Sequence, residues 1–230
     1  MSLHLVRTIG RQLLTALAFL ARPEISVVHG DVKPENVLLC DAHRARVKLI
    51  DFGSAAPAPA DAAAAAATAR RCVQSRYYRA PEVLLGLPHA APIDVWSLGC
   101  LLVEMHAGSP LFPGTDARDM LARMTALLGP PPSHMLSGLG TTATTCATTT
   151  AFGATSTTSG MPRTVEEVAR ALAGVVDAAR AARGGQAGHT GADYACFCDA
   201  VARMLAYDPA VRITPAAALA HPFFRTAPVT

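Results

Sequence analysis

Charged and aromatic residues are scarce in this 230-residue chain, at 16% and 5% of the sequence. The formal net charge of +3 is too small to indicate nucleic acid or an anionic membrane surface as a partner. No apolar run approaches the roughly 18 residues that a membrane span needs, and no cleavable leader pattern opens the chain. These absences favour a cytoplasmic or nuclear protein that acts on small molecules or on other proteins.

Paired cysteine motifs are missing as well. The six cysteines include no CxxC pair and no regular spacing, which argues against a disulfide framework or a zinc site. Reduced thiols are therefore expected. Cys196 and Cys198 form a CxC, which we assign to the interior of a helix rather than to a metal.

Apolar periodicity predicts a mainly α-helical fold with one small β-hairpin. The hairpin is expected where two short apolar runs, 37–39 and 47–50, flank a polar turn. A capping-box pattern at Thr164 and Glu167 marks the start of one helix, and Gly129 with the prolines after it marks the end of another. The predicted helices span residues 3–21, 93–108, 117–132, 164–184, 193–206 and 215–220.

Two stretches of biased composition interrupt this pattern. Residues 54–69 consist mainly of alanine and proline, which predicts a mobile surface loop, with a turn or two of helix in the alanine run as the alternative. Residues 137–160 are rich in threonine and glycine and have no apolar period, which predicts a disordered insert.

The stretch HGDVKPEN, residues 29–36, places three kinds of polar group close together in a loop before the hairpin. Phosphoryl transfer needs a carboxylate near the attacking hydroxyl, a cation near the transferred phosphate and oxygen ligands for magnesium. Asp31, Lys33 and Asn36 supply one of each. Asp51 follows the hairpin as a second magnesium ligand, within the tripeptide DFG.

Together with APE at residues 80–82, these motifs resemble the catalytic half of a eukaryotic protein kinase. The resemblance is strongest to the dual-specificity tyrosine-regulated kinases of the CMGC group. It runs from about residue 2 to residue 224, and is weakest across the two biased stretches. The stretches that carry the closer likeness are QSRYYRAPEVLLGLP, IDVWSLGCLLVEMHAGSPLFPG, GHTGADY and MLAYDPAVRITPAAALAHPFF.

The resemblance implies a protein serine/threonine kinase, or a dual-specificity one, that uses ATP and Mg²⁺ to phosphorylate hydroxyl groups of protein substrates. It implies that Asp31 is the catalytic base and that Lys33 contacts the transferred phosphate. By the same resemblance, Asn36 and Asp51 hold magnesium.

The resemblance also assigns supporting roles to residues around the catalytic loop. Leu38 and Ile50 would line the floor of the adenine site. His29 would brace the loop, and Asp94 would hold the loop backbone from the central helix. Ser75 would tie the substrate loop to the catalytic aspartate and lysine.

Two further pairs are implied in the substrate loop. Glu82 and Arg212 would form a buried ion pair that fixes the loop. Tyr77 and Tyr78 would pack their rings within it.

The sequence departs from the family pattern in the catalytic loop and in the activation segment, which comprises residues 54–71 and the loop after them. Gly30 replaces the arginine that usually precedes the catalytic aspartate, and Cys72 replaces the activation tyrosine of the resembled subgroup. Because a thiol is not the phosphate acceptor that this site uses, we expect Arg76 and Arg79 to pair with another anion, such as Asp61 or an ion from solvent.

The largest departure concerns the small lobe, which closes over ATP in protein kinases with a glycine-rich loop, a strand lysine and a helix glutamate. The lysines of this chain are Lys33 and Lys48, and only Gly10 precedes the catalytic loop motif. We therefore expect residues 1–230 to form the large, C-terminal lobe alone, without an N-terminal lobe. A fragment of a longer gene product, a mistaken start and a genuine short protein all remain open.

Three hypotheses follow. The gene product is a kinase of which this chain is the catalytic-loop lobe, and a missing small lobe or a partner protein completes it. Alternatively, the chain is a pseudokinase that binds proteins without catalysis. The third hypothesis is a decaying duplicate without a role, which the alanine and threonine tracts would suit.

Overall fold

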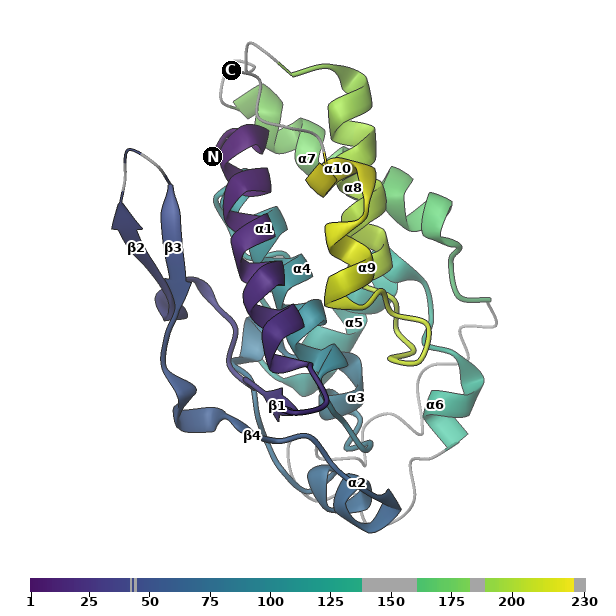
Figure 1. Ribbon diagram of the computed structural model, residues 1–230. Coiled ribbons are helices and arrows are strands. Elements are labelled where there is room, and N and C mark those ends of the chain that lie inside the picture. Colours follow the sequence, from purple (N-terminus) through teal and green to yellow (C-terminus); the bar gives the residue numbers. More distant parts are fainter. Residues whose placement is uncertain (42, 44, 138–160, 183–188, 226–230) are drawn as a thin grey trace.

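The central feature of the fold is helix α4 (Pro92–Ala107), against which several of the other helices pack (Figure 1). The computed structural model describes residues 1–41, 43, 45–137, 161–182 and 189–225. Almost every face of α4 is buried, as its apolar sequence predicts, and Gly108 ends it with a left-handed φ of 87°. Its single tryptophan, Trp96, is fully buried and stacks on Phe112.

Helix α1 (Leu3–Leu20) lies against α4 and also contacts α8 (Gly191–Met204), α9 (Pro215–Leu219) and α10 (Pro222–Arg225). Its apolar face is buried, which confirms the helix predicted at 3–21. A Cβ on Gly10 would lie 2.9 Å from the Phe224 ring and 3.0 Å from a Leu102 methyl group. Glycine at this position therefore allows α1 to approach its neighbours closely.

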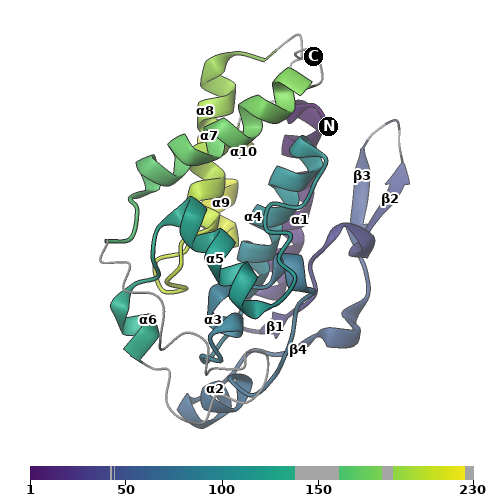
Figure 2. The same cartoon turned by 180° about the vertical axis from the view of Figure 1, so that it is seen from behind.

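Helices α5 (Ala117–Leu128) and α7 (Val165–Ala182) pack together on the side of α4 seen in Figure 2, and α6 (Ser133–Ser137) follows α5. The predicted capping box is present, because Glu167 N–H donates to Thr164 Oγ1 at 3.3 Å and Thr164 N–H donates to Glu167 Oε2 at 2.8 Å. Helix α5 ends at Gly129, whose φ is 80°. The helices predicted at 193–206 and 215–220 correspond to α8 and α9.

The strands form two small antiparallel sheets. The predicted hairpin is present as β2 (Val37–Asp41) and β3 (Arg46–Leu49), with an irregularity in register between Leu39 and Asp41. Gln12 attaches the hairpin to α1, since its amide group bonds to Ala45 O at 2.8 Å and to Val47 N at 3.1 Å. A second ribbon, β1 (Val27–Val28) with β4 (Ala56–Pro57), was not predicted.

The prediction of a mobile loop over residues 54–69 is wrong in part. This stretch contains β4 and helix α2 (Ala62–Thr68), so the alternative of a short helix in the alanine run is confirmed. Alanine has the highest intrinsic helix propensity, and the Asp61 side chain caps the helix by accepting from Ala64 N–H. Thr68 Oγ1 then accepts from His89 N–H at 2.8 Å and attaches α2 to the body of the domain.

Residues 138–160, which make up nearly all of the predicted insert, lie outside the described residues, as do 183–188 at the predicted end of α7. Cys72 is disulfide-bonded in the structure, so the expectation of reduced thiols throughout is wrong at this position.

No helix among the described residues is long and apolar enough to cross a membrane.

Candidate active site

The Asp31 carboxylate, which lies in the loop between β1 and β2, is held by three side chains. Its Oδ1 accepts from Ser75 Oγ at 2.8 Å and from Ser75 N–H at 3.0 Å. Its Oδ2 accepts from Asn36 Nδ2 at 3.1 Å and lies 2.7 Å from Lys33 Nζ. The structure therefore brings together the three residues that the sequence pattern selects and the serine that the resemblance adds.

The charges of this cluster stabilise one another. Burial opposes ionisation of Asp31, but hydrogen bonds from Lys33 and Ser75 outweigh it and hold the pKa of Asp31 below its usual value. The hydrogen bond to Asp31 raises the pKa of Lys33. Both groups are consequently charged at neutral pH.

The backbone before Asp31 is fixed from the central helix, as the resemblance implies. The two Asp94 carboxylate oxygens accept from His29 N–H at 2.7 Å and from Gly30 N–H at 2.9 Å. Burial raises the pKa of Asp94 to about 6, although the two N–H donors favour its charged form. Gly30 has a φ of 76°, and a Cβ at this position would lie 3.0 Å from the carbonyl oxygen of Ser54.

His29 joins the catalytic loop to the chain around Asp51. Its Nδ1 accepts from Asp31 N–H at 3.2 Å, which leaves Nε2 to donate to Ile50 O at 3.1 Å. The Phe52 ring packs edge-on against the imidazole, with centroids 4.8 Å apart. Burial lowers the pKa of His29, so the ring is neutral and braces the loop.

Asp51 and Asn36 are the candidate ligands for magnesium. Ile50 N–H donates to Asn36 O at 2.9 Å, and this bond brings the chain before Asp51 next to the catalytic loop. Asp51 has a left-handed φ of 63°, and its Oδ1 accepts from Gly53 N–H at 3.1 Å.

The donor set fits Mg²⁺, which binds oxygen ligands and is commonly held by one or two protein groups together with phosphate oxygens and water. The described residues contain no group of three or more histidine, cysteine or acidic side chains that could hold a metal without such help. Cys196 and Cys198 lie in α8, as assigned from the sequence.

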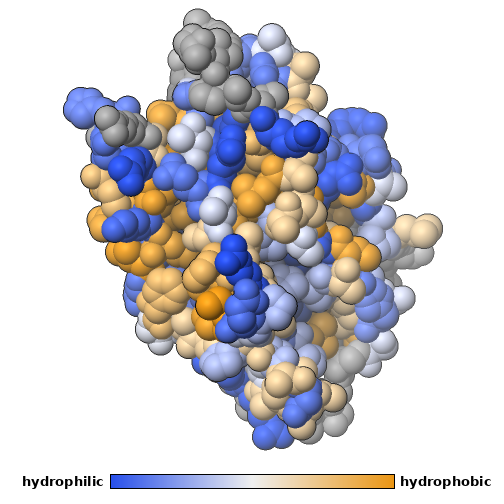
Figure 3. Space-filling model, viewed as in Figure 1, coloured by the Kyte–Doolittle hydropathy of each residue, from blue (hydrophilic) through white to orange (hydrophobic). Residues whose placement is uncertain are grey.

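The proposed adenine floor lies on the hairpin. Leu38 is 49% exposed on β2, and Ile50, directly after β3, is half-buried. Leu39 and Phe52 are exposed to a similar extent. Figure 3 shows hydrophobic surface gathered on the side of the molecule where the hairpin lies.

Within the residues that the structure describes, Arg76 and Arg79 pair with no carboxylate, so the expected pairing with one such as Asp61 is wrong there. Arg76 Nη1 donates to Thr115 O at 2.6 Å, and Arg79 donates to the carbonyl oxygens of residues 73 and 74 at 2.7–3.2 Å. Asp61 is used as the cap of α2. Backbone carbonyls therefore take the place of the expected carboxylate, and the alternative of an ion from solvent stays a prediction.

The predicted ion pair of the substrate loop is present. Arg212 Nη1 and Nη2 lie 2.7 Å and 2.9 Å from the two Glu82 carboxylate oxygens. Both side chains are fully buried, at 0% and 1% exposure. The pair joins the short helix α3 (Pro81–Leu84) to the loop between α8 and α9.

Comparison with known proteins assigns this arrangement to a family. The family described as "Protein kinase domain" matches residues 1–224. The chain belongs to the protein kinase family. Within it, the chain resembles dual specificity tyrosine-phosphorylation-regulated kinases, so the resemblance inferred from the sequence is confirmed.

Individual relatives show the extent of the match. The chain is 37% identical over 232 residues to dual specificity tyrosine-phosphorylation-regulated kinase 3 of Rattus norvegicus, and 38% identical over 226 residues to the kinase mbk-2 of Caenorhabditis elegans. These alignments cover 96% and 97% of this chain, but only 36% and 26% of the relatives. This protein kinase chain thus spans about a third or less of their length.

Sequence reasoning missed one residue that shapes the substrate loop of this kinase domain. Gln74 is buried with a φ of 68°, and its side chain bonds to Ser97 Oγ, to the carbonyl of Ile93 and to the N–H of Ala80. These bonds attach the residue next to Ser75 to helix α4, and so they fix the backbone that carries Ser75. The only signal in the sequence was a polar residue next to the loop serine, which does not distinguish a buried side chain from an exposed one.

Proposed function

We propose that this chain carries the catalytic loop of a protein serine/threonine kinase, or of a dual-specificity one, that transfers the γ-phosphate of ATP to hydroxyl groups of proteins. The observation that carries the proposal is the geometry around Asp31. Ser75, from the substrate loop, bonds to one carboxylate oxygen, while Lys33 and Asn36 bond to the other. One oxygen of the carboxylate therefore contacts the substrate loop. The other contacts Lys33 and Asn36, which are proposed to act on the phosphate and on magnesium.

In this proposal Asp31 orients the attacking hydroxyl. Its lowered pKa keeps it ionised, so it accepts a hydrogen bond from the substrate hydroxyl and takes the proton as the phosphoryl group is transferred. Lys33 carries the positive charge that offsets the negative charge of the phosphoryl group. Magnesium, when bound, neutralises phosphate charge, and Asn36 and Asp51 are its proposed ligands.

A kinase also needs groups that hold the α- and β-phosphates, usually a glycine-rich loop and a strand lysine. Apart from Lys33, the only lysine in this chain is Lys48, which is exposed on β3 opposite Leu38. We therefore propose that residues 1–230 are the C-terminal lobe of a kinase domain. A small lobe, from the same gene product or from a partner protein, would cover the nucleotide.

The second candidate is a pseudokinase or protein-binding module. It is favoured by the exposed apolar side chains on the nucleotide-facing side, since Leu38, Leu39 and Phe52 are each about half exposed. In this alternative a protein occupies that surface and no phosphoryl transfer takes place.

A radiolabelled-ATP assay on a generic basic protein separates the two candidates. We expect the chain alone to show no more than trace transfer, because positioning of the nucleotide supplies most of the rate enhancement. The small lobe of a related kinase, fused before Met1, should raise activity by orders of magnitude. Asp31→Asn in the same fusion should abolish the gain.

The outcomes of this assay distinguish a kinase lobe from a pseudokinase. Activity of the unfused chain well above that of Asp31→Asn would contradict the need for a second lobe. A fusion that folds and binds ATP but transfers no phosphate would favour the pseudokinase. Circular dichroism and ATP-dependent thermal stabilisation of the fusion establish that it is folded and loaded.

A further inference from the structure

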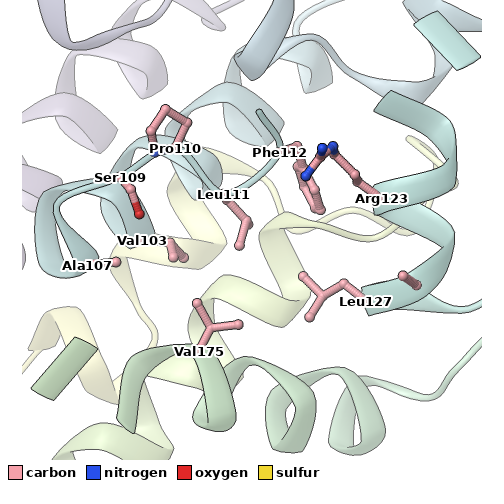
Figure 4. A pocket seen from close by; sticks show the side chains of 10 residues that line it. Val103, Ala107, Ser109, Pro110, Leu111, Phe112, Arg123, Leu127 and Val175 are labelled. Atoms are coloured by element: carbon pink, nitrogen blue, oxygen red, sulfur yellow. The ribbon is translucent and has the colours of Figure 1, made fainter. Parts of the chain in front are cut away.

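A cavity of about 340 Å³ lies away from the candidate active site, between the end of α4, the segment that follows it, α5 and α7 (Figure 4). Its volume is within the range of small-molecule sites. Figure 4 shows Leu111, Leu127 and Val175 pointing into the same space from three separate segments. No residue of the catalytic loop or of the substrate loop lines it.

The side chains that line the cavity are apolar except for those of Ser109 and Arg123. Arg123 Nε donates to both carboxylate oxygens of Asp119 at 3.1 Å, and the side chain is 44% exposed. Within the part of the chain that the structure describes, no hydrogen bond or ion pair engages its two Nη groups. Arg123 and Phe112 both line this cavity, and Figure 4 shows the Arg123 side chain extending from α5 toward it.

This arrangement selects a class of ligand. The apolar walls favour a hydrocarbon or aryl group, and the free Nη donors of Arg123 favour a carboxylate, which matches the guanidinium geometry. Asp119 already offsets much of the arginine charge, and the lining contains no second cation, so a doubly charged phosphate ester would be poorly neutralised. We propose that the cavity binds a small amphipathic monocarboxylate, such as a medium-chain fatty acid.

The site is linked to the substrate loop through a chain of contacts. Asp119 accepts from Thr115 N–H at 3.0 Å, and Thr115 O accepts from Arg76 Nη1 at 2.6 Å. Arg76 directly follows Ser75, which bonds to Asp31. A carboxylate bound to the Nη groups shares the Arg123 guanidinium with Asp119 and repels the Asp119 carboxylate, so binding weakens the hydrogen bond that Asp119 accepts from the Thr115 amide.

Isothermal titration calorimetry of the full chain with octanoate tests the proposal, with octan-1-ol as the uncharged probe. We expect saturable binding of octanoate, and about tenfold weaker binding to Arg123→Gln, as the loss of a charge-assisted hydrogen bond predicts. Binding of octan-1-ol should not change. Arg203→Gln is the matched control, because Arg203 forms the same kind of i,i+4 pair with Asp199, is also 44% exposed and does not line the cavity.

A cavity-filling variant gives an independent test. Val175→Phe projects a ring into the space from α7 and should abolish binding of both probes. Ala126→Phe does the same from the exposed side of α5, and serves if the first variant fails to fold. Hydrogen exchange at the Thr115 amide should become faster with octanoate and be unaffected by octan-1-ol.

The following results would overturn the inference. One is the absence of saturable octanoate binding to the unmodified chain. Another is octanoate binding that Arg123→Gln and a folded cavity-filling variant leave unchanged. Equal weakening by Arg123→Gln and Arg203→Gln would place the charge effect outside the cavity, and unchanged exchange at Thr115 would refute the link to the substrate loop.

Discussion

Arg212 and Glu82 lie 130 residues apart in the sequence and form a bidentate ion pair with no access to solvent. The arginine also donates to the carbonyl oxygens of Pro92, Ala206 and Tyr207, and its guanidinium lies over the Trp96 ring. Every charged group of the pair is therefore satisfied only while the substrate loop, α4 and the loop before α9 are all in place.

Glu82→Ala should destabilise the domain by about 3–5 kcal/mol, because it leaves the buried Arg212 charge without its carboxylate counter-ion. The exposed Glu166→Ala, in the first turn of α7, is the control and should change stability little. Calorimetric melting temperatures of the two variants provide the measurement. Equal and small shifts would mean that the pair does not contribute as its burial implies.

We predict that the activation segment carries no phosphotyrosine in protein purified from cells. Position 72 is a cysteine, and Tyr78 is buried with its hydroxyl donating to Glu104 Oε2 at 2.7 Å. A phosphate on Tyr78 would lie against that carboxylate. Phosphopeptide mapping is the measurement, and high occupancy on Tyr77 or Tyr78 would contradict the prediction.

Stability should fall as the pH is lowered below about 6.5, the usual pKa of histidine. Burial lowers the pKa of His29, so the unfolded chain takes up a proton in this range that the folded chain does not. This contribution to stability is thus fully present above the unfolded pKa of histidine and is lost progressively as the pH falls below it.

Urea unfolding at pH 7.5 and at pH 5.5 measures this effect. His29→Gln should reduce the difference between the two pH values, whereas the exposed His43→Gln should leave it unchanged. His89, whose pKa is also lowered by burial, contributes in the same direction and remains in both variants. An identical pH response in all three proteins would rule out His29 as a source.

Gly30→Ala should cost about 1–3 kcal/mol, the usual cost of holding a side chain in unfavourable backbone geometry. The φ of Gly30 is 76°, and the new Cβ would meet the Ser54 carbonyl oxygen at 3.0 Å. Gly174→Ala is the contrasting variant, because nothing lies within 4 Å of a Cβ there and it is within α7. That change should stabilise the chain by up to about 1 kcal/mol.

Chemical denaturation of both glycine variants gives the two free energies. If Gly30→Ala were neutral, glycine would not be required by the backbone at this position. The presence of glycine at position 30, in place of the arginine that usually precedes the catalytic aspartate, would then need another explanation.

Much of the local structure could be predicted from the sequence. Helices α1, α4 and α7 follow from apolar periodicity, the Thr164 and Glu167 capping box and Gly108, because helix hydrogen bonds and caps join residues only a few positions apart. The same holds for Asp31, Lys33 and Asn36, whose spacing within one loop already brings a carboxylate, a cation and an amide together.

The long-range contacts could not be derived in this way. Nothing near Arg76 or Arg79 indicated that backbone carbonyls would be their partners, and nothing near Gln74 indicated its burial. The Asp94 and Glu82 contacts were expected only through the family resemblance.

The sequence by itself therefore determined which helices form and which polar groups share the catalytic loop. Only the tertiary structure decided which of these groups lose water and which distant atoms replace it. The physical reason is that a buried polar group must find a hydrogen-bonding partner wherever packing places one, and packing joins segments far apart in the chain. Asp94 with the loop backbone, and Arg212 with Glu82, are such partners.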